Sequence, residues 1–285
     1  MFALRRLSGG ELALTREHEL VAAPRHGAIA WSAFDPSAYE PSVLSAAADL
    51  WATRAEQELC SLGIFTDLAA QLQRLGAPLD WSGAFARMIA DEARHTDLCL
   101  RMCETLGHPR TPNIDESQLQ LLGPKASRSA VRQLILAAFC IGETISGRMF
   151  RRGLRVTTVP LAREVMAAIV SDETFHAELG WELGALSMRD DGPEFSQERA
   201  ELAAALPRLF RHYAVLCGAT ASSSSATDQE DAPSPNFGTL SAAGYARAFF
   251  DGMHEDVVPG LVSIGLPEAE AAYAELLASL GRAQH

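Results

Sequence analysis

The stretch "DEARHTDLCL" at residues 91–100 has a near copy in "DETFHAELGW" at residues 172–181. Each copy reads Asp-Glu, two unmatched residues, a histidine, one more residue, an acid and a leucine. Residues three apart in an α-helix lie on nearly the same face, so each copy places one carboxylate beside one imidazole. The two pairs are Glu92 with His95 and Glu173 with His176. A single Glu-x-x-His match arises by chance, but its repetition inside two apolar segments predicts a shared site.

Apolar residues recur at helical spacing in four long segments of the chain. The segments run from Pro41 to Leu75, from an N-cap at Asp80 to about Leu106, from about Ser127 to Leu154, and from about Pro160 to the residues before "RDDGPE" at 189–194. The first segment contains Glu58, the third contains Glu143, and the second and fourth each contain one Asp-Glu-x-x-His motif. Four long amphipathic helices with short to medium connections predict an all-α fold built on a four-helix bundle.

The rest of the chain is expected to add to this bundle and not to form a second domain. Residues 1–40 mix glycine, proline and charge without periodicity and are expected to be an irregular lead-in to the bundle at 41–190. In residues 191–285 we expect further helices that pack on the bundle. These are 195–217, with a break at Pro207, and the closing helices 240–258 and 267–283. The Ser/Asp/Pro-rich stretch at about 218–236 has the composition of a mobile surface loop.

Composition narrows the classes of partner. The 285 residues carry a net charge of −12, so no broad basic field exists to attract nucleic acid. No stretch has the 18 or more uncharged apolar residues of a membrane span, so no membrane partner is expected. The five cysteines form no Cys-x-x-Cys pair, which is typical of reduced thiols in a cytoplasmic protein.

The other two bundle helices each offer one acid on an apolar face. Glu143 lies in the apolar run "LILAAFCIGETISGRMF" at 134–150, where an ionised carboxylate would be costly to bury without a cation. Glu58 is in line with Trp51 and Phe65 on the apolar face of the first helix. Glu56 competes with it, but its helical neighbours are more polar, as expected of a solvated surface acid. We therefore prefer Glu58 as the ligand.

Four carboxylates and two imidazoles from four helices make the ligand set of a dinuclear metal site. The predicted ligands are Glu58, Glu92, His95, Glu143, Glu173 and His176. Metal-bound imidazoles usually donate their other N–H to a carboxylate, and an aspartate precedes each motif glutamate. We expect Asp91 to pair with His176 and Asp172 to pair with His95. The alternative for both aspartates is a place on the helix surface.

These motifs resemble those of the ferritin-like superfamily of di-iron carboxylate proteins. The matching stretches are "ELCSLGIF" (58–65), "LGAP" (75–78), "DEARHTDLC" (91–99), "CIGET" (140–144) and "DETFHAELGW" (172–181). The resemblance covers about residues 41–190, and it places Glu58 and not Glu56 at the ligand position. It implies a ferritin-like four-helix bundle with additional C-terminal helices that holds two Fe ions. Manganese or a mixed Fe/Mn pair would also suit such ligands.

The resemblance also implies an activity. Two ferrous ions in this family reduce O2 jointly, so we expect an oxidase or oxygenase that acts on a small organic substrate. The alternatives are an iron-handling or peroxide-scavenging protein of ferritin or rubrerythrin type, or a non-catalytic metal-binding helical protein. The chain is longer than a cage-forming ferritin and lacks the cysteine pairs of a rubredoxin-like site. Ile169 stands where di-iron arylamine N-oxygenases carry an additional histidine ligand, which argues against that reaction.

Several residues near the ligands have two interpretations. Phe65, Met88, Phe139 and Phe175 line a substrate pocket or are ordinary core residues. Thr144 follows a ligand and either hydrogen-bonds an oxygen species or lies on the helix surface. The arginines of "GRMFRRGLR" at 147–155 complement the helix dipole, or they bind an anionic substrate or an acidic carrier protein. An electron-donor protein and a second copy of the chain in a homodimer are further partners compatible with an oxidase or oxygenase.

Overall fold

The computed structural model is mostly helical, with 77% helix and 1% strand, so the predicted all-α class is confirmed. It describes residues 1–3, 20–23, 27–119, 121–123, 126–189, 194–220 and 235–282. The chain divides into two compact units, Met1–Ala126 with Thr158–Asp172 and Ser127–Thr157 with Glu173–His285. The predicted boundaries at 40/41 and 190/191 remain predictions. Much of the predicted lead-in and most of the predicted loop at 218–236 lie outside the described residues.

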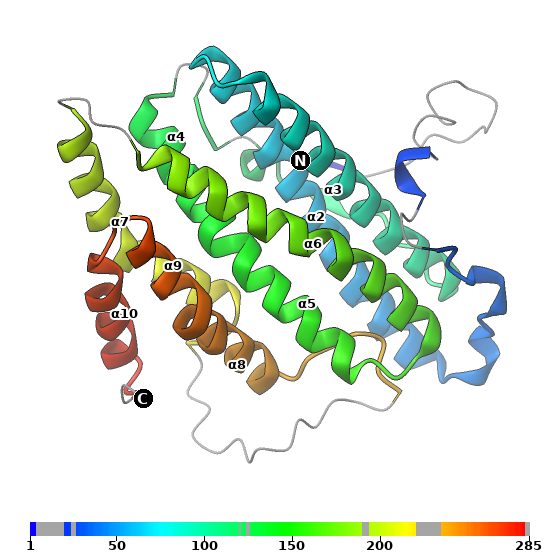
Figure 1. The fold of residues 1–285 in the computed structure, drawn as a ribbon. Coiled ribbons are helices and arrows are strands. Elements are labelled where there is room, and N and C mark those ends of the chain that lie inside the picture. Colours follow the sequence, from blue (N-terminus) through cyan, green and yellow to red (C-terminus); the bar gives the residue numbers. More distant parts are fainter. Residues whose placement is uncertain are drawn as a thin grey trace. The chain divides into compact units, whose positions relative to one another are not determined.

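The first unit is built on two long antiparallel helices, α2 (Pro41–Arg74) and α3 (Leu79–Thr105), which lie side by side (Figure 1). Pro41 occupies the first turn of α2, where its missing N–H costs nothing. The chain reverses at Gly76, whose φ of +79° favours glycine. The predicted N-cap at Asp80 is wrong. The helix begins at Leu79 after an N-cap at Pro78, and Asp80 lies in the first turn, where its charge complements the helix dipole.

Short elements complete the first unit. They are the strands β1 (Phe2–Ala3) and β2 (Asn113–Ile114), which pair antiparallel, and the 3-10 helices η1 (Trp31–Ala33), η2 (Pro36–Ala38) and η3 (Glu116–Gln118). Asp35 and Asp115 cap η2 and η3 by accepting hydrogen bonds from Ser37 and Ser117. The lead-in before α2 is therefore partly helical, with η1, η2 and the helical residues 20–22 among its described residues.

The second unit begins with one long helical run that changes type along its length. It consists of α4 (Arg128–Leu134), the π-helix η4 (Ile135–Glu143) and α5 (Thr144–Val156). Ser127 caps the run by accepting a hydrogen bond from the Ala130 N–H. By length and composition this run could cross a membrane, but 72% of its most apolar window is buried, as in the core helix of a folded domain.

The remaining helices are α6 (Pro160–Ser187), through which the unit boundary passes, α7 (Phe195–Leu216), α8 (Ala242–Gly252), the π-helix η5 (Met253–Val257), α9 (Val258–Ser263) and α10 (Glu268–Ser279). The predicted break at Pro207 is wrong, because α7 continues through it. The fully buried Leu206 and Phe210 flank the proline, and we attribute the continuity to their packing in the core. In the second unit α10 lies along α7 (Figure 1).

Candidate metal centre

In the first unit, α2 and α3 bring two carboxylates and one imidazole together. Glu58 of α2 and the pair Glu92 and His95 of α3 are all buried. An oxygen of Glu58 lies 3.3 Å from Nδ1 of His95, and an oxygen of Glu92 lies 4.0 Å from the same nitrogen. One ligand atom from each of the three residues lies within 4.8 Å of the other two. We call Glu58, Glu92 and His95 the first triad.

The far side of the His95 ring is held by Asp172 and Arg94. Oδ2 of Asp172 lies 3.4 Å from Nε2 of His95, which is the partner expected from the sequence. The Arg94 guanidinium donates to Asp172 at 2.8 Å and to Asp91 at 2.7 Å. It also donates to the backbone carbonyls of Val21 and Ala23. These contacts direct Nδ1 of His95 toward the two glutamates, which is the orientation that a metal ligand needs.

The charges around His95 favour a positive charge at this position. Burial acts to lower the pKa of His95, but its hydrogen bonds to Asp172 and Glu58 and the charge of Glu92 raise this pKa well above its usual value. The imidazole therefore lies among carboxylates that stabilise a cation. A metal ion on Nδ1 would take the place of a proton there.

In the second unit, η4 and α6 bring together the same three residue types. Glu143 ends η4, while Glu173 and His176 lie one turn apart on α6, and all three are buried. An oxygen of Glu143 lies 3.5 Å from Nδ1 of His176, and an oxygen of Glu173 lies 3.9 Å from it. Their ligand atoms also lie within 4.8 Å of one another. We call these three residues the second triad.

The two triads have the same construction. In each, a glutamate from one helical segment faces Nδ1 of a histidine on the next segment, at 3.3 Å or 3.5 Å. The glutamate of the Glu-x-x-His motif lies at 4.0 Å or 3.9 Å from that nitrogen. Burying two carboxylates next to each other is costly unless a cation compensates them. These buried Glu/His groups can therefore hold a metal ion, and carboxylate with imidazole suits a hard or borderline divalent metal.

Two glycines of α6 let the π-helix approach closely. A Cβ on Gly180 would lie 2.9 Å from Cβ of Phe139, and one on Gly184 would lie 2.6 Å from Sγ of Cys140. The Cys140 thiol also donates to the Gly180 carbonyl at 3.5 Å. A side chain at either glycine would push η4 away from α6. The small residues of "AELGWELG" thus set the separation between the segments that carry Glu143 and His176.

The predicted pocket residues are mostly core residues in the structure. Phe65, Met88 and Phe139 are fully buried, and Phe175 is half-buried with its ring edge-on to His176. Thr144 is buried, and its hydroxyl oxygen accepts a 3.1 Å hydrogen bond from the indole N–H of Trp181. A pocket role for these residues remains a prediction.

Burial separates the two candidate ligands of α2. Glu58 is buried whereas Glu56 is only half-buried, consistent with the choice of Glu58 as the ligand.

The arginines at the end of α5 are paired with acids. In the second unit Arg148 pairs with Glu255 at 2.7 Å and Asp256 at 2.5 Å, and Arg152 approaches Asp251 at 3.4 Å. Acids of the C-terminal helices thus neutralise part of the arginine cluster that was considered for binding an anion.

Sequence reasoning missed three residues that support the triads. Arg94 is one of the unmatched positions inside the first motif, Trp181 is the last residue of the stretch that contains the second motif, and Tyr213 lies on a segment that was predicted only to be a helix. A buried arginine between Asp91 and His95 was the one available signal, since an arginine in an apolar helix needs anionic partners. Trp181 and Tyr213 carried no signal, because their partners are distant in sequence.

No family model, curated protein or solved structure matches the chain. What the two triads can do therefore follows from their own residues and geometry.

Proposed function

We propose that the protein is a dinuclear, di-iron oxidoreductase that uses O2 to oxidise a small organic substrate. The observation that carries the proposal is the repetition of one buried triad of two glutamates and a histidine Nδ1. A structural metal site needs a single cluster with a closed set of ligands. Two matched, carboxylate-rich clusters are what a metal pair that changes its oxidation state requires.

We propose further that α2, α3, the run α4–η4–α5 and α6 form a ferritin-like four-helix bundle around one centre. The order of ligands along the chain supports this: glutamate, Glu-x-x-His, glutamate, Glu-x-x-His. Asp172, which orients the histidine of the first triad, and Glu173, which belongs to the second, are consecutive residues of α6. Helices α7 to α10 are then additions to the bundle.

Iron is the metal we propose, with manganese or a mixed pair as the alternative. Neither triad offers a thiolate, and carboxylate oxygen with imidazole nitrogen is a typical ligand set for these metals. Two ferrous ions bound here would supply the electrons that reduce O2.

The residues of the chain contribute charge and orientation to this chemistry. The glutamates compensate the metal charge, and Asp172 with Arg94 fixes the ring of His95. The Thr144 hydroxyl oxygen accepts the Trp181 N–H, so its own hydrogen points away from the indole and can be donated elsewhere.

Metal content and O2 consumption test the proposal together. Protein purified from iron-replete cells is expected to contain about two irons per chain. The Glu143→Ala variant should lose metal while keeping its helix content by circular dichroism. Glu178→Ala is the matched control, since Glu178 lies on the same helix as the second triad but is exposed. The ferrous protein should consume O2 faster when its substrate is added.

Three results would overturn the proposal. A content of one zinc per chain would indicate a structural site. An iron content far above about two per chain would indicate iron storage. Full metal occupancy in Glu143→Ala would show that the ligand set is wrong.

A further inference from the structure

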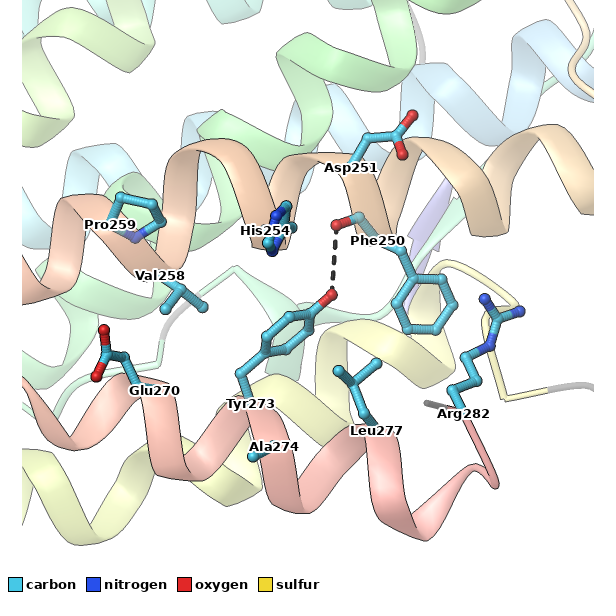
Figure 2. A pocket seen from close by; sticks show the side chains of 10 residues that line it. All are labelled: Phe250, Asp251, His254, Val258, Pro259, Glu270, Tyr273, Ala274, Leu277 and Arg282. Carbon is cyan, nitrogen blue, oxygen red and sulfur yellow. Dashed lines mark hydrogen bonds between the residues drawn. The ribbon is translucent and has the colours of Figure 1, made fainter. Parts of the chain in front are cut away.

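A surface groove of about 580 Å³ lies between C-terminal helices of the second unit. One wall comes from α8, η5 and α9, and the other is one face of α10 (Figure 2). Val258, Tyr273, Ala274 and Leu277 give it an apolar floor. None of the lining residues belongs to either triad. The volume is within the range of pockets that bind small molecules.

The two walls are joined by a hydrogen bond at the middle of the groove. The Tyr273 hydroxyl donates to the backbone carbonyl oxygen of Phe250 at 3.4 Å (Figure 2). Burial raises the pKa of Tyr273 to about 12, so the phenol keeps its proton at neutral pH. The groove is therefore largely formed before any ligand arrives, which reduces the entropy cost of binding.

One end of the groove presents an oriented positive charge. The guanidinium carbon of Arg282 lies 3.9 Å from the centroid of the Phe250 ring. A guanidinium held over an aromatic ring by a cation–π contact keeps its N–H groups available for a planar anion. Among the described residues no acidic side chain forms an ion pair with Arg282. An arginine held in this way can bind a carboxylate through two parallel hydrogen bonds.

The other charges of the groove select against a second anion. Asp251 already forms an ion pair with Arg152, whose Nη1 lies 3.4 Å from Oδ2 of Asp251. Glu270 is exposed and lies in the first turn of α10, at the end of the groove opposite to Arg282 (Figure 2). A second carboxylate there would be repelled. His254 lies between the two ends and faces Tyr273.

We propose that this groove binds a small monocarboxylate with a flat apolar body. The carboxylate lies on the guanidinium edge of Arg282, and the apolar body covers Tyr273, Ala274 and Leu277. The arrangement combines one charged contact that fixes orientation with an apolar surface that contributes affinity.

Three probes with nearly the same body test the proposed ligand class. The purified full-length chain is titrated by calorimetry with phenylacetate, 2-phenylethanol and 2-phenylethylammonium. Phenylacetate is expected to bind at least about tenfold more tightly than the other two, because a charged hydrogen-bond pair is lost in each of them. Equal affinities, tighter binding of the ammonium compound, or no binding of phenylacetate would overturn the proposal.

Variants place the binding in this groove. Arg282→Gln should weaken phenylacetate binding about tenfold, and Ala274→Phe should abolish it by filling the floor. Arg208→Gln, at an exposed arginine of α7, is the matched control and should bind normally. Circular dichroism confirms folding of each variant. Unchanged affinity in both groove variants would overturn the proposal. Binding should also persist in Glu143→Ala, so failure here is distinguishable from failure of the metal proposal.

Discussion

Tyr213 of α7 donates a 2.7 Å hydrogen bond to the carbonyl oxygen of Ala137, inside the π-helix that ends at Glu143. The Tyr213 oxygen also lies 2.8 Å from where a Cβ on Gly142 would be, so only glycine leaves room for it. Burial and, less strongly, the charge of Glu143 raise the pKa of Tyr213, which keeps it a donor. Because the register of a helix sets the direction of its side chains, Tyr213 positions Glu143 through the backbone.

Replacing Tyr213 by phenylalanine should therefore affect both stability and metal binding. The Ala137 carbonyl loses its phenol donor, so the free energy of unfolding should fall by about 1–3 kcal/mol in urea titrations. Affinity for Mn(II), measured by calorimetry, should fall as well, because the π-helix is less firmly held. Tyr245→Phe, at a half-buried tyrosine of α8, is the control and should change neither. Reduced stability with unchanged metal affinity would limit Tyr213 to a structural role.

Glu58 and Glu56 are two residues apart on α2 and should respond differently to the same change. Glu58→Gln removes a charged oxygen that faces Nδ1 of His95 at 3.3 Å, so metal content by elemental analysis should fall. Glu56→Gln removes a half-buried acid outside the triad and should leave metal content unchanged. The opposite pattern would identify Glu56 as the ligand.

The parts of the site that could be predicted depend on local spacing. Glu92 and His95 lie three residues apart on one helix, so helical geometry alone brings them together. Glu58 could be chosen over Glu56 because it continues the apolar line of Trp51 and Phe65, and burial follows that line. The all-α class also follows from periodicity that extends over long segments.

The parts that could not be predicted depend on contacts between distant residues. The run "ILAAFCIGE" is apolar at almost every position, so its sequence cannot distinguish a π-helix from an α-helix. The π-helix is in contact with Gly180 of α6 and Tyr213 of α7, which are far from it in sequence. Pro207 predicted a break, but packing of its buried neighbours kept α7 continuous.

Arg94 should be among the residues least tolerant of substitution. Arg94→Leu would leave Asp91 and Asp172 buried without the cation that bridges them at 2.7 Å and 2.8 Å. Loss of one partner from a buried charge network costs about 3–5 kcal/mol, so the urea midpoint of the chelator-treated protein should fall sharply. Arg87→Gln is the control, because Arg87 approaches the same Asp91 from the surface at 3.6 Å. Its effect should stay below about 1 kcal/mol. Similar losses in both variants would contradict the bridging role.

Gly260 of α9 should be intolerant even of alanine. A Cβ there would lie 2.3 Å from the Trp181 ring, which donates its N–H to Thr144 beside Glu143. Gly260→Ala must displace the indole, so the free energy of unfolding should fall by about 1–3 kcal/mol. The emission spectrum of Trp181 is obtained by subtracting the spectrum of the corresponding protein with Trp181→Phe. Its emission maximum should shift in Gly260→Ala, because the hydrogen bond of the indole breaks.

Gly83 of α3 provides the matched control for this substitution. It is exposed, and a Cβ on it would meet nothing within 4 Å. Gly83→Ala should therefore leave the fluorescence unchanged and stabilise the protein by up to about 1 kcal/mol, because alanine has the higher helix propensity. If Gly260→Ala instead matched Gly83→Ala in both measurements, Trp181 would not pack against α9, and the contact that orients the indole toward Thr144 would be refuted.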